Sequence, residues 1–414
     1  MTYDEALSAI HSRKTFSSAP SLQRMARLME ALGNPQDSIR TVHVAGTNGK
    51  GSVCAMVESA LRAAGYRTGL FTSPYLVDFR ERIQINRRLI SEAMLVDCYR
   101  KVTEQEERLW SEGSEPLNEF ELVTAMGFLA FAMEQVDYAV IEVGLGGRYD
   151  ATNVISGPEV CCITSISLDH TAVLGDTVAQ IAAEKGGIIK PGCPVVLAAQ
   201  EPEAEAVLRG IAAGRVAPLV YTEPWEVCGM DVHGLRLRLG NDDLRLPLLG
   251  AYQAQNASAA WQVCITLGLA PDAIRRGFSS VEWPGRLQYV AGNPPLLIDA
   301  GHNPAGIKAL GIALDSLFPD KSVIAVMAMM RDKDHALCVP AIAGRSRLLI
   351  AATVGLPRSL PPEELAGEAS AWCRTLTAQS VTAGIALARS LAEPDDLIVV
   401  CGSVYAAGEA QNSI

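Results

Sequence analysis

The feature that most constrains the fold is a glycine-rich segment between a strand-like and a helix-like stretch. Residues 38–46 are rich in β-branched side chains and predict a strand, whereas residues 49–65 carry apolar side chains at helical spacing up to a glycine. A second strand is predicted over 66–73. Strand, helix and strand in this order form a right-handed crossover between parallel strands, so we expect a parallel α/β sheet.

The glycine-rich segment has the composition of a phosphate-binding loop. It consists of Gly46, Thr47, Asn48, Gly49, Lys50, Gly51 and Ser52. Glycines let backbone N–H groups turn toward phosphate oxygens, and the following helix adds the positive end of its dipole. Lys50 would reach the terminal phosphates and Ser52 a bound Mg²⁺. Its first glycine lies two residues closer to the Gly-Lys pair than in the usual P-loop. The alternative is a glycine-rich turn with a solvated lysine.

Polar side chains follow two further predicted strands, over 138–144 and 159–167. Glu142 lies at the end of the first, and Asp169 and His170 follow the second. Parallel sheets bind ligands at these strand ends, and carboxylate and imidazole groups there can hold a divalent cation. Asp and Ser also start ordinary turns, so each segment alone fits a capped loop equally well. Together with the lysine-bearing loop they favour a metal–nucleotide site.

The rest of the chain predicts a second α/β series after a short antiparallel portion. Residues 218–249 alternate apolar and charged side chains around a turn at Asn241, Asp242 and Asp243, which predicts a hairpin with one wet face. Pro and Gly in EWPGR (282–286) indicate a hinge. We therefore expect a P-loop-containing, doubly wound, mainly parallel sheet with a small antiparallel portion over 1–284, and a smaller Rossmann-like α/β domain over 285–414.

Charge and composition exclude several classes of protein. The net charge of −11 without a basic stripe argues against nucleic acid as a partner. No window resembles a membrane span, and the charged N-terminus does not resemble a signal peptide. The ten cysteines are scattered in apolar stretches without CxxC spacing, which is typical of buried thiols in a reducing cytosol and not of a zinc site. We expect a cytoplasmic protein that does not bind membranes.

Eight motifs in this order resemble one family. They are AGTNGKGS, FTSPYL…ERI, EVGLGGRYDATN, SLDHTAVLGDT, IAAEKGGIIKPG, GAYQAQNASAA, WPGRLQ and DAGHNP. The set resembles the folylpolyglutamate and dihydrofolate synthases, the folate members of the Mur ligase superfamily. The likeness runs from about residue 40 to the C-terminus and is strongest over 44–190. It implies an ADP-forming ligase that adds L-glutamate to dihydropteroate, to reduced folates or to both, through an acyl phosphate.

The resemblance also implies cofactors and roles for individual residues. It implies ATP, two Mg²⁺ ions and a carbamylated Lys185, although a lysine near a helix end would by composition alone be solvated. Lys50, Glu142, His170 and Lys185 would be catalytic. The metal ligands would be Ser52, Ser73, Glu142 and His170. Besides the loop, Asn256, Arg286, Asp299 and His302 would contact ATP. Phe120, Asp150 and Ser403 would line the folate, pterin and glutamate pockets. The partners would be small molecules only, and the enzyme a monomer.

The chain departs from the family pattern at a few positions. Tyr75 stands where the family often has His, EKGG replaces the commoner EKAG, and DAGHNP inverts the commoner DGAHNP. Tyr75 puts the acceptor preference in doubt. A Mur ligase acting on a UDP-linked cell-wall precursor is the nearest alternative, but only about 45 residues precede Gly46, too few for a UDP-binding domain. A P-loop regulatory protein without ligase activity is a second alternative, against which DAGHNP and the second α/β series argue.

Overall fold

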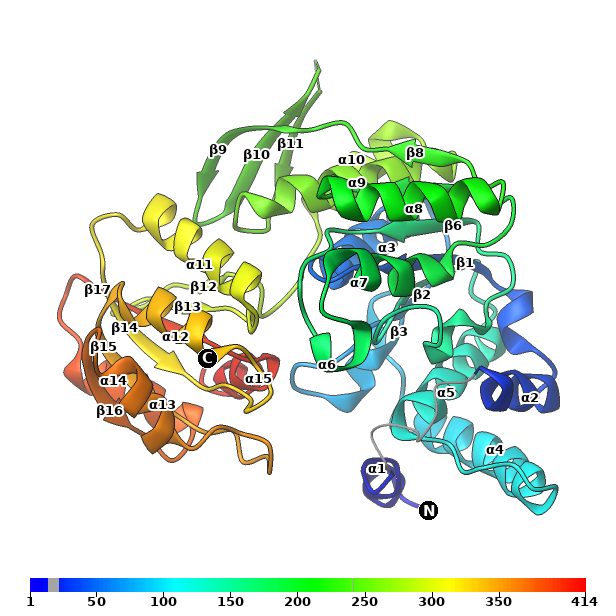
Figure 1. Ribbon diagram of the computed structural model, residues 1–414, viewed down its shortest axis with the longest axis horizontal. Helices are drawn as coiled ribbons and strands as arrows, with labels where there is room; N and C mark the ends of the chain where they lie inside the picture. The colour runs from blue at the N-terminus through cyan, green and yellow to red at the C-terminus, as the bar shows by residue number, and fades with distance from the viewer. Residues whose placement is uncertain (14–21, 241) are drawn as a thin grey trace. The chain divides into compact units, whose positions relative to one another are not determined.

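The computed structural model describes residues 1–13, 22–240 and 242–414 (Figure 1). The chain divides into two compact units. The first contains residues 1–74, 80–224 and 255–280, and the second contains 75–79, 225–254 and 281–414. Each unit has its own sheets and cores. No helix within the described ranges is long and apolar enough to span a bilayer.

The first unit is built on an eight-stranded sheet whose central strand carries the glycine-rich loop at its end. Its order is β4-β3-β2-β5-β1-β6-β7-β8, and only β3 and β4 run antiparallel to their neighbours. β1 pairs in parallel with β5 and β6, so the loop after β1 meets the ends of both. The strands are β1 (Arg40–Ala45), β2 (Thr68–Phe71), β3 (Ile83–Ile85), β4 (Arg88–Leu89), β5 (Tyr138–Glu142), β6 (Val160–Ile163), β7 (Val195–Leu197) and β8 (Leu219–Tyr221).

Helices cover this sheet and bury most of its apolar side chains. α3 (Lys50–Ala63) is buried continuously from Gly51 to Leu61 and packs on α10 (Pro271–Ser279) and the sheet. α7 (Val178–Lys185) and α8 (Pro202–Gly214) form a second core with β6 and β7. The other helices of five or more residues that lie wholly or mostly in this unit are α1 (Tyr3–His11), α2 (Gln23–Ala31), α4 (Glu92–Ser111), α5 (Glu119–Met133) and α9 (Tyr252–Thr266).

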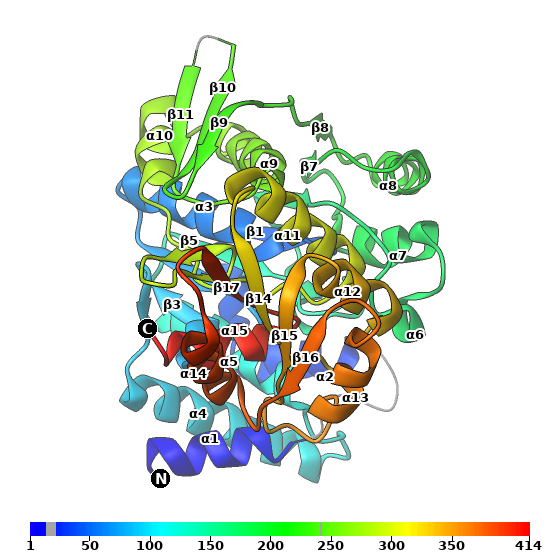
Figure 2. The ribbon, with the colours of Figure 1, turned by 90° about the vertical axis from the view of Figure 1, so that its left-hand side faces the viewer.

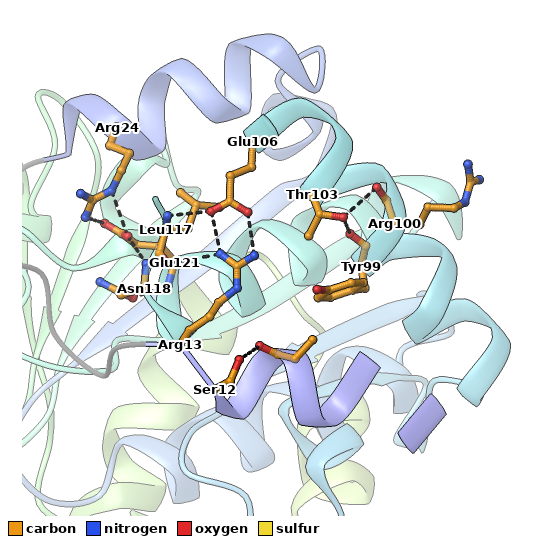
Figure 3. Close-up of polar contacts among 11 residues, drawn as sticks. Ser12, Arg13, Arg24, Tyr99, Arg100, Thr103, Glu106, Leu117, Asn118 and Glu121 are labelled. Carbon is orange, nitrogen blue, oxygen red and sulfur yellow. Dashed lines mark hydrogen bonds and ion pairs between the residues drawn. The ribbon is translucent and has the colours of Figure 1, made fainter. Parts of the chain in front are cut away.

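Two arginine–glutamate pairs tie the N-terminal helices to α4 and α5 (Figure 3). Arg13 contacts both carboxylate oxygens of Glu106, at 2.6 and 2.7 Å, and Arg24 contacts both of Glu121, at 2.6 and 3.1 Å. Glu121 also completes the capping box of α5 with Asn118. The side chains of Arg24 and Glu121 are only 11% and 8% exposed, so this pair is a buried, bidentate contact. It fixes α2 against the first turn of α5.

The second unit combines a three-stranded antiparallel sheet with a six-stranded, mostly parallel one (Figure 2). The six-stranded order is β12-β13-β17-β14-β15-β16, and alternate residues of its strands enter two separate cores, as a doubly wound sheet requires. Its strands are β9 (Glu226–Asp231), β10 (Gly234–Leu239), β11 (Asp242–Leu246), β12 (Gln288–Val290), β13 (Leu296–Ile298), β14 (Ser322–Met327), β15 (Ser346–Ala351), β16 (Arg374–Thr377) and β17 (Asp396–Cys401). Its helices are α11 (Pro304–Leu317), α12 (His335–Ala343), α13 (Pro362–Ala369), α14 (Val381–Leu391) and α15 (Val404–Gln411).

The predicted fold class is confirmed, and the antiparallel portion needs a correction. The expected hairpin is β10–β11, but β9 adds a third strand. Asp242 and Asp243 belong to β11 and not to a turn, because Leu239 pairs with Asp242 and the connection is shorter than expected. Asn241 lies outside the described residues. The hinge at 282–286 and the domain boundary after residue 284 stay predictions.

Candidate nucleotide and ligation site

The glycine-rich loop joins the end of β1 to the start of α3, as the sequence predicts. Gly46 and Gly49 have φ values of 150° and 88°, in the region that favours glycine. A Cβ atom at Gly46 would lie 1.8 Å from the Oγ1 of Thr164, and one at Gly49 would lie 2.2 Å from the Oδ1 of Asn256. The loop therefore has no room for a side chain at either position. Asn256, from α9, is placed beside the loop.

Two backbone carbonyls and one hydroxyl group after β6 hold the loop in shape. The backbone N–H of Thr47 donates to the carbonyl of Ser165 at 2.9 Å, and its hydroxyl donates to the carbonyl of Ser167 at 3.0 Å. The hydroxyl of Thr164 donates to the carbonyl of Asn48 at 2.7 Å. Sequence reasoning missed these three residues after β6. The signal that could have found them is the run of hydroxyl side chains in ITSIS, at the end of a strand adjacent to β1.

The first unit also brings Lys50, Glu142 and Ser73 together. Lys50 Nζ donates to the carbonyl of Thr47 at 3.3 Å and lies 4.0 Å from Glu142 Oε1. The backbone N–H of Ser73 donates to Glu142 Oε2 at 3.1 Å. Ser52 is buried in the first turn of α3. A carboxylate at the end of β5, one strand away from the loop, is thus held next to the lysine that would meet the phosphates.

Lys185 is buried against the loop, so the solvated lysine expected from composition alone is wrong. Its Nζ donates to the carbonyl of Gly46 at 2.7 Å. Burial, reinforced by the charge of Lys50, lowers the pKa of Lys185 to about 7, although Asp169 and Asp150 oppose the shift. A substantial fraction of the amine is therefore neutral at physiological pH.

His170 lies at the start of the short helix α6 (Thr171–Leu174) in a left-handed conformation, with φ 51°. Its side chain is 43% exposed, and its Nε2 is 3.9 Å from Asp169 Oδ1. The described residues contain no cluster of three or more His, Cys, Asp or Glu that could hold a metal. A cation beside the glycine-rich loop would instead use hydroxyl and carboxylate oxygens such as those of Ser52 and Glu142, together with phosphate oxygens. That is the donor set that Mg²⁺ prefers at nucleotide sites, so the residues present fit it.

Phe120 packs against the loop after β5, and Asp150 lies at the end of that loop. The Phe120 ring packs on Gly144, where a Cβ atom would lie 2.4 Å from it, and meets Phe71 edge-on with centroids 6.1 Å apart. Asp150 is buried and accepts hydrogen bonds from Leu145 N at 2.8 Å and Thr152 N at 3.0 Å. Burial raises its pKa, and these donors oppose the shift. Asp150 therefore caps a 3₁₀ turn as well as being a predicted pterin contact.

The remaining predicted residues belong to the second unit. Asp299 is buried and accepts from the N–H groups of Leu287 at 3.0 Å and Gly301 at 2.8 Å. Burial raises the pKa of Asp299, and the charge of Arg286 opposes the shift. His302 Nδ1 is 3.0 Å from the carbonyl of Ala300. Ser403 is buried and caps α15. Asp299 and Ser403 thus have structural contacts of their own, and their ligand contacts stay predictions.

Comparison with known proteins gives matches over almost the whole chain. The Mur ligase middle domain matches residues 44–264, and the Mur ligase glutamate ligase domain matches residues 285–404. A folylpolyglutamate synthase of Lacticaseibacillus casei is 37% identical, over 100% of this chain and 99% of the relative. A dihydrofolate synthase/folylpolyglutamate synthase of Bacillus subtilis is 35% identical over 97% of both chains. The structure of a Mycobacterium tuberculosis folylpolyglutamate synthase complexed with ADP superposes with a TM-score of 0.93, at 36% identity, covering 99% of this chain and 98% of that one.

Proposed function

The chain belongs to the Mur ligase family, in its branch of folylpolyglutamate and dihydrofolate synthases, and we propose that it uses both dihydropteroate and reduced folates as acceptors. It is an ATP-dependent, ADP-forming ligase that adds L-glutamate to folates. Use of dihydropteroate as well is supported by the bifunctional name of the Bacillus subtilis relative and by the GGRYDATN segment around Asp150.

The observation that carries this function is the convergence of two lysines on one phosphate loop. Lys50 and Lys185 both donate to loop carbonyls, at Thr47 and Gly46. Phosphoryl transfer depends on positioning and on neutralising negative charge, and both lysines lie at the loop that would hold the phosphates. The backbone N–H groups at the start of α3 and the ammonium of Lys50 would hold the terminal phosphates of ATP.

The chemistry proceeds in two steps. A carboxylate oxygen of the acceptor attacks the γ-phosphorus of ATP, and the bond to ADP breaks, which leaves an acyl phosphate. The amino nitrogen of L-glutamate then attacks the acyl carbon, the amide bond forms, inorganic phosphate leaves and the nitrogen loses a proton. Phosphate turns a poor leaving oxygen into a good one. The charge of Lys50 stabilises the phosphoryl oxygens in the first step.

We assign Mg²⁺ ligands by chemistry of the donor atoms. Ser52, Ser73 and Glu142 supply oxygens near the loop, and His170 supplies an imidazole for a second ion. Bound Mg²⁺ would neutralise phosphate charge and orient the γ-phosphoryl group. The hydrogen bond from Ser73 N to Glu142 Oε2 orients the carboxylate, and this supports its role as a ligand.

We also propose that Lys185 is carbamylated. Carbon dioxide reacts with a neutral amine, and burial provides that form at physiological pH. The resulting carbamate would be an additional carboxylate beside the loop. A Lys185→Ala enzyme should lose activity, and a short carboxylate such as acetate should restore part of it. Full activity of Lys185→Ala without acetate would contradict the proposal.

The other predicted contacts complete the substrate sites. Asn256, Arg286, Asp299 and His302 would bind ATP, Phe120 and Asp150 the pterin-bearing acceptor, and Ser403 the incoming glutamate. The contact of Asn256 with Gly49 supports the first of these. We propose that the domain boundary follows residue 284, because the match to the glutamate ligase domain begins at residue 285.

The test is phosphate release from MgATP with L-glutamate, measured with dihydropteroate, with tetrahydrofolate and without an acceptor. We expect release with both acceptors and only background without one. Release with tetrahydrofolate alone would limit the enzyme to chain extension and direct attention to Tyr75 and Asp150. Release with neither acceptor but with a UDP-linked cell-wall precursor would replace the folate assignment. Release without any acceptor would indicate a nucleotide-hydrolysing regulator.

A further inference from the structure

A series of buried, hydrogen-bonded side chains leads from the middle of β1 to the loop after β5. His43 is fully buried in β1, in a strand whose other inward residues are mostly apolar. Its Nε2 lies 2.8 Å from the hydroxyl of Thr152. That hydroxyl donates in turn to Asp150 Oδ1. The three side chains connect the strand that leads into the phosphate loop with a residue assigned above to the acceptor.

The direction of the hydrogen bonds follows from counting protons. Each oxygen of Asp150 accepts a backbone N–H, from Thr152 at Oδ1 and from Leu145 at Oδ2, and Oδ1 also accepts the hydroxyl of Thr152. The single hydroxyl proton of Thr152 therefore points to Asp150. The hydroxyl oxygen can then only accept from His43, which requires a proton on Nε2 and a bare Nδ1. Within the described residues Nδ1 indeed has no hydrogen-bond partner.

This arrangement costs stability, which separates it from ordinary core packing. A buried ring nitrogen without a partner is unfavourable, and a leucine of similar size in β1 would carry no such penalty. Most of the other buried side chains of β1, such as Val42 and Val44, are apolar. A histidine at this position is explained if its N–H is needed by Thr152.

Asp150, the last residue of this hydrogen-bonded series, shapes the acceptor side of the site. Asp150 Oδ2 holds the N–H of Leu145 and so closes the loop 143–150 on itself. In that loop Gly144 packs on Phe120, and Arg148 N donates to the carbonyl of Glu184 at 2.8 Å, next to Lys185. A rotated Asp150 would lose its hydrogen bond to Leu145 N, which closes the loop that carries these two contacts.

We propose that His43 and Thr152 are positioning residues that fix the carboxylate of Asp150, and with it the loop 143–150, for the pterin-bearing acceptor. The proposal rests on the function proposed above, because it assumes that Asp150 meets the acceptor. Neither residue touches substrate. Their effect is on acceptor binding and not on ATP binding.

The first experiment compares KM values for dihydropteroate and for ATP in His43→Leu and Thr152→Val. We expect the acceptor KM to rise about tenfold, the value of one hydrogen bond to a charged group, with the KM for ATP changed by less than about twofold. Thr152→Ser keeps the hydroxyl and should retain the normal acceptor KM. Val42→Ala is the matched control, since it removes buried volume from the same strand without touching Asp150. An equal rise of acceptor KM in Val42→Ala would show a merely structural effect and overturn the proposal.

A double substitution tests whether His43 and Thr152 act through the same series of hydrogen bonds. His43→Leu combined with Thr152→Val should raise the acceptor KM no further than either change alone, because each already breaks the connection. If the double variant raises the acceptor KM by the product of the two single increases, the proposal is overturned.

The tautomer of His43 gives a readout that needs no substrate. The ¹⁵N spectrum of histidine-labelled protein, with His43 assigned by its absence in His43→Leu, should show a protonated Nε2 and a bare Nδ1. A proton on Nδ1 would overturn the proposed direction. If the variant is too unstable to record, Thr152→Ser and Thr152→Val carry the kinetic test alone.

Asp150→Asn separates failure of this proposal from failure of the proposed function. If Asp150→Asn leaves the acceptor KM unchanged, the acceptor contact is wrong and so is the positioning role. If Asp150→Asn raises it while His43→Leu and Thr152→Val do not, the acceptor contact stands and only the positioning role is overturned.

Discussion

At Gly46 and Gly49 the phosphate loop runs so close to its neighbours that not even a methyl group can be added. The neighbours are the hydroxyl of Thr164 and the amide of Asn256, side chains distant in sequence. The loop's chemistry could be predicted from its residues and their order, but these supports could not, because they come from other elements. The same holds for the burial of Lys185, which depends on how α7 docks on the end of β1.

Gly49→Ala should abolish most activity while leaving the protein folded. A Cβ atom there must displace Asn256 and adopt a φ of 88°, so we expect kcat/KM for ATP to fall roughly 100-fold, equivalent to about 3 kcal/mol of overpacking and strain. Phosphate release measures it. Gly210→Ala, in the exposed interior of α8 with open space around it, is the control and should leave activity unchanged. Normal activity of Gly49→Ala would show that the loop adapts.

Acid should destabilise the protein through His43. Burial, with a smaller effect of Lys190, lowers the pKa of this imidazole to about 3, so the folded state keeps it neutral while the unfolded chain binds a proton below about pH 6.5. At neutral pH the imidazole is uncharged in both states, and the folded state loses stability relative to the unfolded chain as pH falls from 6.5 toward 3. Between about pH 7.5 and pH 5 the loss is about 2 kcal/mol. Urea unfolding of wild type and His43→Leu at both pH values checks this, since the variant should lack that part of the pH dependence. Parallel pH profiles would contradict it.

At the scale of helices and strands, the α2–α5 contact shows how a buried ion pair adds to the apolar packing of a short helix. The guanidinium of Arg24 donates to both carboxylate oxygens of Glu121, and both side chains are nearly buried (Figure 3). The same glutamate caps α5, whose first turn carries Phe120. An ion pair at this point thus sets the position of a predicted wall of the acceptor pocket.

Arg24→Met should cost about 3 kcal/mol of unfolding free energy, because it leaves Glu121 charged, buried and without its bidentate partner. Arg27→Met, on the same helix, is the control. Its ion pair with Glu112 is about half exposed on both sides, so its loss should cost less than about 1 kcal/mol. Urea denaturation of both variants gives the comparison, and equal losses would show that burial of the pair does not matter.

The elements that could be predicted are those with long, strongly patterned stretches. The central parallel strands are short, nearly continuously buried runs rich in β-branched and apolar residues, and α3 follows the loop without interruption. The missed elements are short or irregular. β12 and β16 are edge strands of three and four residues, and α12 contains Pro340, which usually breaks helices. The third strand of the small sheet, β9, is half-exposed and has no clear alternation.

At the scale of the whole molecule, ten thiols report on how completely the cores are packed. Only Cys228 is exposed, and Cys193 and Cys373 are partly buried. Burial raises the pKa of the core thiols, to about 12 for Cys98 and Cys161, so little thiolate forms in the folded state. The seven buried cysteines are Cys54, Cys98, Cys161, Cys162, Cys264, Cys338 and Cys401.

We therefore expect three kinetic classes when the native protein meets a thiol reagent. One cysteine should react rapidly, two slowly, and seven only on unfolding. Cys228→Ser should remove the rapid class and leave the others unchanged. Rapid reaction of more than three thiols in the native protein would contradict the packing described here.

The strand order of the large sheet has a consequence for synthesis. β1 pairs with β5 and β6, which follow it by about 100 residues or more, and the phosphate loop needs Thr164 and Ser165 for its shape. At typical translation rates β1, which is buried in the folded protein, leaves the ribosome several to about 25 seconds before its second neighbour has been made. During that interval the nascent chain exposes β1 without its pairing partners and cannot yet bind ATP. Chaperones that shield nascent chains would therefore act on this protein before nucleotide can stabilise it.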